Sequence, residues 1–158
     1  NDPPDAPVYD DLKGALTFLR SVDRADQKRL AVFGFCRGGV HAVMAARAHP
    51  EIRAIVVFHG FAFRPPQAQP GVQPFDLVEG VDVPALILHG TEDERAPLED
   101  MRRMEDRMRA LGKACEFVFY DGARHGFAVR THPVFEAHAA RQSFDEAKAA
   151  ALTARTGR

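Results

Sequence analysis

Short apolar runs alternate along the chain with amphipathic segments, and this alternation constrains the possible folds more than any other feature. The runs are continuously apolar, which is typical of strands buried on both faces of a parallel sheet. They span residues 30–35, 54–58, 84–89 and 115–120. Apolar residues at helical spacing mark the other segments, which span residues 8–22, 38–48, 98–111 and 137–151. This order predicts an α/β fold with a parallel sheet of about four strands flanked by helices.

The length of the chain, 158 residues, fits one domain, since most domains have about 100–150 residues. We therefore expect a single domain over residues 1–158. Three prolines oppose a helix at the start, so residues 1–7 are expected to form an extended arm. Residues 60–80 carry four prolines and three glycines and are predicted to be a long surface loop. The chain begins with Asn1 rather than Met, so we interpret it as a fragment or a processed product.

The charge balance and the cysteine content exclude several classes of protein. Lys and Arg number 21 against 22 Asp and Glu, and this lack of a basic excess argues against a nucleic-acid partner. No apolar run approaches the roughly 20 residues that span a bilayer, so no membrane association is expected. The two cysteines form neither a disulfide framework nor a CxxC motif, which favours a cytoplasmic location. No histidine pair has metal-ligand spacing with a carboxylate, so no metal site is expected.

The sequence Gly-Phe-Cys-Arg-Gly-Gly at 34–39 lies between a predicted strand and a predicted helix. This is the setting of a nucleophile elbow, a sharp turn that raises its central side chain, here Cys36, above the sheet. Gly34 and Gly38 supply the small flanking residues that such a turn needs. The helix N-terminus favours a thiolate, and the backbone N–H of Arg37 is a candidate oxyanion-hole donor. The simpler interpretation is a buried cysteine beside glycines.

A nucleophile needs a base and a residue that orients the base, and both types follow the later strands. Asp93 comes after the third apolar run and His125 after the fourth, in the order nucleophile, acid, histidine. The carboxyl ends of parallel strands meet at one edge of the sheet, so these side chains can converge with Cys36. Glu92 and Glu94 compete with Asp93 for the acid role. A turn-forming aspartate and a loop histidine bonded to a backbone carbonyl are the non-catalytic alternatives.

Taken together, the motifs at 34–39, 89–93 and 120–127 resemble those of the dienelactone hydrolase family of α/β-hydrolases. The resemblance implies a truncated α/β-hydrolase-like sheet, because the family's strands before the elbow have no counterpart here. It also implies hydrolysis of small esters or lactones with no metal and no organic cofactor. In that scheme Cys36 is the nucleophile, His125 the base and Asp93 the residue that orients His125.

Several further residues are candidates for binding the substrate. His59 ends the second apolar run and is predicted to line the cleft, or else to be an ordinary strand-end residue. Phe61 and Phe63 either wall an acyl pocket or anchor the proline-rich segment. Arg130 lies near the place where the family grips a substrate carboxylate, so we assign it to substrate binding. The family's loop for the second oxyanion donor is not matched, and simple esters are expected rather than dienelactone.

Two function hypotheses from different classes therefore stand. The first is a carboxylic ester hydrolase that acts through a Cys-His-Asp triad and a thioacyl-enzyme intermediate. The second is a non-catalytic assembly or interaction module derived from a hydrolase fragment. An amidotransferase-like cysteine hydrolase is disfavoured, because His125 is followed by Gly126 and Phe127 rather than by a His-x-Glu pair.

The truncation also predicts a partner. Without upstream strands, the strand at 30–35 would form a bare apolar edge, and such edges pair readily with other chains. We therefore expect a homodimer that buries this edge.

Overall fold

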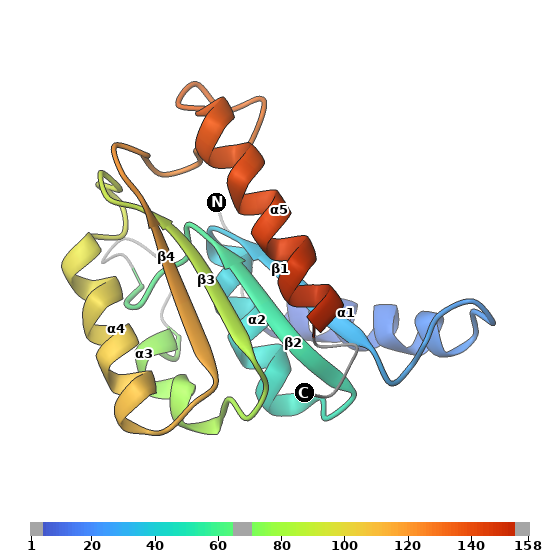
Figure 1. Ribbon diagram of the computed structural model, residues 1–158. Coiled ribbons are helices and arrows are strands. Elements are labelled where there is room, and N and C mark those ends of the chain that lie inside the picture. The colour runs from blue at the N-terminus through green and yellow to red at the C-terminus, as the bar shows by residue number, and fades with distance from the viewer. Residues whose placement is uncertain (1–4, 65–70, 154–158) are drawn as a thin grey trace.

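A computed structural model describes residues 5–64 and 71–153, which form a single four-stranded sheet covered by helices on both faces (Figure 1). All strand pairs are parallel and the strand order is β1-β2-β3-β4. The strands are β1 (Leu30–Phe35), β2 (Ile52–Phe58), β3 (Ala85–Gly90) and β4 (Cys115–Tyr120). The predicted α/β fold with a parallel sheet of four strands is confirmed.

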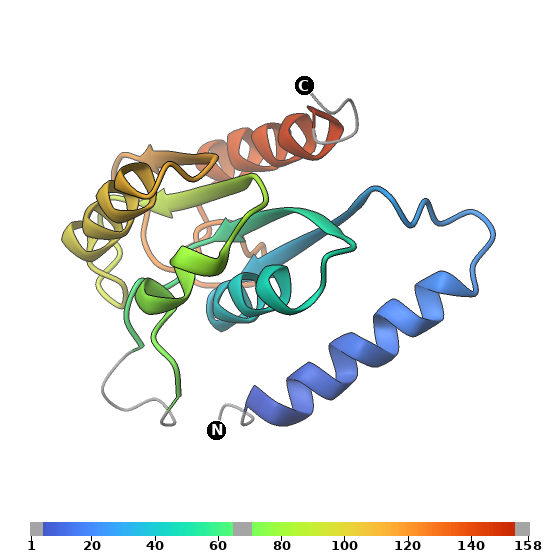
Figure 2. The same cartoon turned by 90° about the horizontal axis from the view of Figure 1, so that it is seen from below.

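Alternate residues of the central strands serve two separate cores. Ile55 and Val57 of β2 face a core closed by the helices α2 (Arg37–Ala48) and α4 (Leu98–Ala110). Val56 and Phe58 face the opposite core, which α5 (Ala137–Thr153) covers. Figure 2 shows α5 on one side of the sheet and α2 on the other. Burial on both faces explains why these strands are continuously apolar rather than alternating.

The first helix, α1, spans Asp5–Arg20 and packs against α2. The expected extended arm is therefore wrong for residues 5–7, and residues 1–4 lie outside the described residues. Pro7 is tolerated because the first N–H groups of a helix have no partner within the helix. Asp5 stands in the same first turn, where a negative charge is favourable.

The predicted surface loop at 60–80 is also corrected in its second half. A short helix, α3 (Pro74–Leu77), and a 3-10 turn, η1 (Val78–Gly80), follow the segment 65–70, which lies outside the described residues. Pro74 suits the first helical position, and Leu77 and Val78 are buried in the same core as α2 and α4. This burial, which local composition does not reveal, holds the segment against the body of the protein.

The strand β1 lies at the edge of the sheet, and within the described residues it pairs with β2 alone. Phe33 at its middle is 42 % exposed, so the expected apolar edge is present. A groove of about 230 Å³ runs between this edge, α1 and α2. Its lining residues are Val8, Tyr9, Leu12, Val32, Phe33, Gly38, His41, Ala42 and Ala45. Figure 2 shows α1 set off from the sheet beyond α2.

Candidate active site

Cys36 is the single residue between the end of β1 and the start of α2, and its backbone has φ 54° and ψ −122°. A positive φ is costly for a residue with a side chain, and such strain is found at functional turns. A Cβ on Gly34 would lie 2.3 Å from the carbonyl oxygen of Gly38, and one on Gly39 would lie 2.5 Å from Val57 Cγ1. A Cβ on Gly38 itself would meet nothing within 4 Å. The tight approaches are thus at Gly34 and Gly39, and the expectation that Gly38 must be small is wrong.

Three side chains from separate strand ends form a hydrogen-bonded series. His125 Nε2 lies 3.2 Å from Cys36 Sγ, and His125 Nδ1 lies 2.8 Å from Asp93 Oδ2. Cys36 follows β1, Asp93 follows β3 and His125 follows β4. The predicted convergence at the carboxyl edge of the sheet is therefore present in the structure. In this arrangement the imidazole can take the thiol proton, while the carboxylate orients the ring and stabilises its positive charge.

The turn after β3 holds Asp93 in place. Its Oδ1 accepts hydrogen bonds from the backbone N–H groups of Arg95 and Ala96, both at 2.9 Å. His89 supports the same turn, with Nε2 2.9 Å from the carbonyl oxygen of Ala96. A carboxylate fixed in this way holds the imidazole of His125 in one orientation.

The competing acids point elsewhere. Glu92 is exposed, and Glu94 lies 3.6 Å from Arg124 in an exposed ion pair. Of the three acidic residues in this turn, Asp93 is the one that the structure brings to His125.

The electrostatics of the series favour an ion pair between sulfur and imidazole. Burial alone would raise the pKa of the Cys36 thiol, but the hydrogen bond and charge of His125 and the N–H of Arg37 outweigh it and lower the pKa. Burial would lower the pKa of His125, but its bonds to Asp93 and Cys36 raise the pKa to about 9. Burial would raise the pKa of Asp93, yet the bond from His125 keeps that pKa below its usual value. Both shifts favour a thiolate beside an imidazolium.

Arg95 also affects the pKa of Cys36, and it was not identified as a site residue from the sequence. Its positive charge also lowers the pKa of Cys36, although its side chain is exposed. The signal was its position two residues after Asp93, in the turn that faces the elbow. The neighbouring Ala96 packs in a small cluster with Val40, against which Cys36 lies.

His59 and Phe61, predicted to line the cleft, both lie against the catalytic candidate His125. The ring of His59 meets that of His125 nearly edge-on at 4.9 Å, and Phe61 lies 5.4 Å from it. His59 has a positive φ of 39° and is 2 % exposed, and burial lowers its pKa to about 3. It is therefore a neutral side chain at all ordinary pH values.

Arg130 is not brought to the site in the same way. It is exposed, and among the described residues no hydrogen bond or ion pair joins it to Cys36, Asp93 or His125. Phe63 stacks on Phe75 at 4.9 Å and so anchors the segment after β2 rather than facing the triad.

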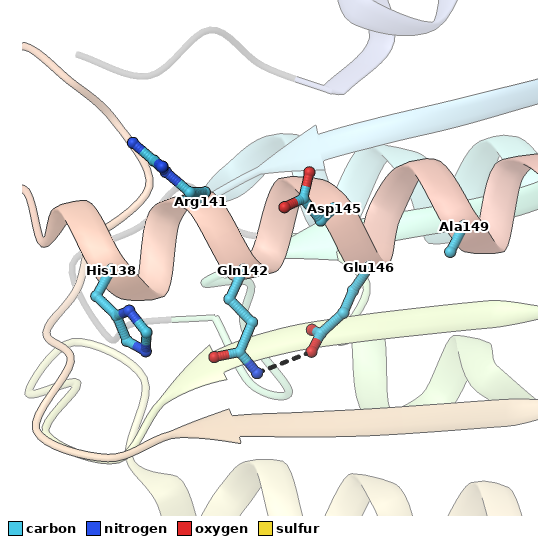
Figure 3. A pocket seen from close by; sticks show the side chains of 6 residues that line it. All are labelled: His138, Arg141, Gln142, Asp145, Glu146 and Ala149. Carbon is cyan, nitrogen blue, oxygen red and sulfur yellow. Dashed lines mark hydrogen bonds between the residues drawn. The ribbon is translucent and has the colours of Figure 1, made fainter.

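A separate hollow lies away from these residues, along α5. It measures about 490 Å³ and is lined by His138, Arg141, Gln142, Asp145, Glu146 and Ala149. Figure 3 shows Gln142 and Glu146 joined by a hydrogen bond on the side that faces the strands, with Arg141 and Asp145 pointing elsewhere. None of the residues that line it belongs to the Cys36 series, so this hollow is not the site of that chemistry.

Neither a metal-binding cluster nor a membrane-spanning helix is present in the described part of the chain. There, no group of three or more His, Cys, Asp or Glu side chains is placed to hold a metal ion. In the same residues, no helix combines the length and the apolar character needed to cross a membrane.

A strand-to-helix elbow with its histidine and acid at later strand ends of a parallel sheet defines the α/β-hydrolase class. Within that class, the sequence pattern of the Dienelactone hydrolase family matches residues 2–153. The chain belongs to the dienelactone hydrolase family, as the motifs in the sequence indicated.

Individual relatives agree with this membership. The chain is 33% identical over 141 residues to a Methylorubrum extorquens protein named "Putative carboxymethylenebutenolidase", covering 89% of this chain and 48% of that protein. It is 31% identical over 112 residues to the "Carboxymethylenebutenolidase" of Rhodococcus opacus, covering 70% of this chain and 43% of that protein. The chain thus spans about half the length of these curated relatives.

A solved structure gives the same result for the fold. The crystal structure titled as a putative dienelactone hydrolase from Klebsiella pneumoniae matches with a TM-score of 0.86 and 26% sequence identity. The match covers 94% of this chain and 62% of that chain.

Proposed function

We propose that this protein hydrolyses small carboxylic esters or lactones through Cys36, His125 and Asp93. The observation that carries the proposal is the continuous series from Cys36 Sγ through His125, at 3.2 Å, to Asp93, at 2.8 Å. The relatives named as carboxymethylenebutenolidases, which are lactone hydrolases by name, support the choice of reaction.

In the acylation step, the Cys36 thiolate attacks the carbonyl carbon of the ester. The carbonyl oxygen becomes an oxyanion, which the backbone N–H of Arg37 stabilises together with a second donor. The imidazolium of His125 gives its proton to the leaving alkoxide, so an alcohol departs and a thioester to Cys36 remains. Asp93 keeps the His125 ring oriented and stabilises its positive charge.

In the deacylation step, neutral His125 takes a proton from water as the water attacks the thioester. The second tetrahedral intermediate collapses, the Cys36 sulfur leaves as a thiolate, and the carboxylic acid is released. His125 is again protonated, so the ion pair of the resting site is restored. No cofactor takes part in either step.

His59 and Phe61 are proposed to form the wall of the acyl pocket, since both rings lie against His125. The wall is uncharged, because burial lowers the pKa of His59 to about 3. Short uncharged acyl groups therefore suit it better than charged ones. Arg130 stays a candidate for contact with substrate at the rim.

The test is hydrolysis of a short p-nitrophenyl ester by Cys36→Ala. Loss of the nucleophile is expected to reduce kcat by about 10³-fold or more, because a thioester can no longer form. The control is Cys115→Ser, which removes the other thiol and is expected to leave kcat within about twofold. Hydrolysis by Cys36→Ala at the rate of the unchanged protein would refute the assignment.

We also propose that the chain forms a homodimer through its β1 edge, in a reducing compartment such as the cytoplasm. The exposed Phe33 and the groove beside α1 support this proposal.

The second candidate function is a non-catalytic assembly module, which would use the same β1 edge to bind its partner. Iodoacetamide labelling separates the two candidates, since a module that lacks an activated thiol would react at Cys36 no faster than at Cys115.

A further inference from the structure

The carboxylate of Asp5 contacts two guanidinium groups and one imidazole at the start of α1. Its Oδ1 lies 3.1 Å from Arg37 Nη2 and 3.1 Å from His41 Nε2. Its Oδ2 lies 2.5 Å from Arg64 Nη2. Burial raises the pKa of Asp5, but these partners outweigh it and lower the pKa, so the carboxylate is charged. Asp5 is therefore a hub of charge-assisted hydrogen bonds rather than a surface residue.

The partners of Asp5 belong to both elements that build the candidate site. Arg37 directly follows Cys36, and His41 lies one turn further along α2. Arg64 lies in the segment after β2 that also carries His59 and Phe61. One carboxylate thus joins the elbow to the segment that packs on His125.

Arg64 transmits this link because its other groups are fixed as well. Its side chain is 5% exposed, its Nε donates to the carbonyl oxygen of Val72 at 2.9 Å, and its backbone N–H donates to Gln73 Oε1 at 2.7 Å. A guanidinium with so little exposure needs a counter-charge, since an unpaired buried charge is costly. Removal of the Asp5 charge would therefore displace Arg64 and the segment that it anchors.

The other end of α1 is tied to the body at a site far from the elbow. Arg20 Nη2 lies 2.5 Å from Glu51 Oε1, just before β2. This second tie also holds α1, but it touches neither α2 nor the segment after β2. The two ends of one helix thus provide a matched pair for experiment.

We propose that Asp5 is a positioning residue of the active site, which fixes the Arg37 backbone at the elbow and the Phe61 segment against His125. The proposal rests on the proposed function, because it gives Asp5 a part in the chemistry of Cys36. It adds a residue from outside the triad and from the region where the sequence indicated only an extended arm.

The first measurement is ester hydrolysis by Asp5→Asn and by the control Glu51→Gln. The asparagine keeps the size of the side chain but cannot balance two guanidinium groups. We expect kcat to fall about tenfold for Asp5→Asn with KM within about threefold, because misplaced oxyanion donors act on the transition state. Glu51→Gln is expected to retain kcat within about twofold. An equal loss in both variants would overturn the proposal, since it would reduce Asp5 to a support for α1.

The second measurement does not depend on hydrolysis. In a Cys115→Ser background, the alkylation rate of Cys36 by iodoacetamide is followed against pH. The groups that face Cys36 are His125, Arg95 and the Arg37 N–H, while Asp93 acts through His125. If Asp5 positions the Arg37 N–H and the wall against His125, the midpoint moves to higher pH in Asp5→Asn, because the thiolate loses these partners.

The direction in which the alkylation midpoint moves tests whether Asp5 positions the site. A midpoint that moves to lower pH would mean that Asp5 acts only as a charge, and an unchanged midpoint would mean that it does not act on the site; either result overturns the proposal. Arg37→Gln is the second variant, because it breaks the same link while Asp5 keeps Arg64 and His41, and the same upward shift is expected. If the unchanged protein hydrolyses no ester, the proposed function fails, but the alkylation midpoint still tests Asp5.

Discussion

His125 is the residue whose protonation controls the candidate site, because it lies between the Cys36 sulfur and the Asp93 carboxylate. Its pKa is raised to about 9 and the pKa of Cys36 is lowered, so both shifts favour a thiolate paired with an imidazolium. The neighbouring His59 remains uncharged, since burial lowers its pKa to about 3. Two neighbouring histidines thus have pKa values shifted in opposite directions, because hydrogen bonds raise the pKa of His125 and burial lowers that of His59.

The pH dependence of hydrolysis follows from these directions. The active form holds a thiolate and an imidazolium, so activity rises as Cys36 loses its proton and declines as His125 loses its proton at about pH 9. Asp93→Asn removes a leading cause of the raised pKa of His125, so the alkaline decline moves to lower pH. It also lowers kcat by about 10²-fold or more, because the ring loses its orientation. A pH profile of kcat measures both, and an unmoved alkaline limb would contradict the role of Asp93.

Arg95 offers a test of long-range electrostatics at the same site. Arg95→Gln removes a charge that lowers the pKa of Cys36, so that pKa rises and alkylation at pH 6 slows by about twofold. The effect shrinks at 1 M salt, since the side chain is exposed and its field is screened. Arg102→Gln on α4 is the control, because Arg102 covers Phe119 and is absent from the causes of the Cys36 shift. Equal effects from both variants would exclude a specific role for Arg95.

At the scale of the elements, the elbow depends on close approach between β1 and α2. Gly34 leaves no room for a Cβ, because the nearest atom would be the backbone carbonyl oxygen of Gly38 at 2.3 Å. Backbone atoms cannot turn aside as a side chain does, so the two elements would have to separate. The position of Cys36 therefore depends on a glycine at the end of the strand rather than on the cysteine itself.

Gly34→Ala is expected to destabilise the protein by about 3 kcal/mol or more and to abolish hydrolysis, because the added Cβ forces the elbow apart. Gly38→Ala is the matched control, since its Cβ would meet nothing within 4 Å. A helical alanine there is expected to change stability by less than about 1 kcal/mol. Chemical denaturation measures both, and similar losses in the two variants would argue against the close approach at Gly34.

At the scale of the whole molecule, the chain spans about half the length of the curated relatives it matches, and among the described residues its β1 strand pairs only with β2. Phe33, at the middle of this edge strand, is 42 % exposed. An edge of this kind favours pairing with a further strand. We therefore expect the exposed edge at β1 to determine the oligomeric state of this chain.

Light scattering coupled to size-exclusion chromatography tests this expectation. The unchanged chain is expected to elute with the mass of a dimer, and Phe33→Lys to shift the mass toward the monomer, because a charge at the centre of the edge opposes pairing. Leu111→Lys is the control, since Leu111 is 40 % exposed at the end of α4, far from the edge in the sheet order. A monomer for the unchanged chain would contradict the proposed homodimer.

The sequence by itself determined the order of strands and helices, the elbow at Cys36 and the two later loops that carry Asp93 and His125. These features are local or follow from chain order, because apolar period and glycine spacing reflect the immediate backbone. The boundaries were less accurate: β2 begins at Ile52, and α1 already includes Asp5. The short helix and 3-10 turn at 74–80 were also not predicted, because the composition of this segment indicated a surface loop.

Only the tertiary structure decided which residues meet across the chain. The link from Asp5 to Arg37 and Arg64, the charge of Arg95 beside Cys36 and the neutral state of His59 all depend on strand order and on what is buried. Local sequence carries no measure of the distance between residues far apart in the chain. The motifs that support the proposed reaction are therefore present in the sequence itself, whereas the surroundings that tune the proposed nucleophile were set by packing.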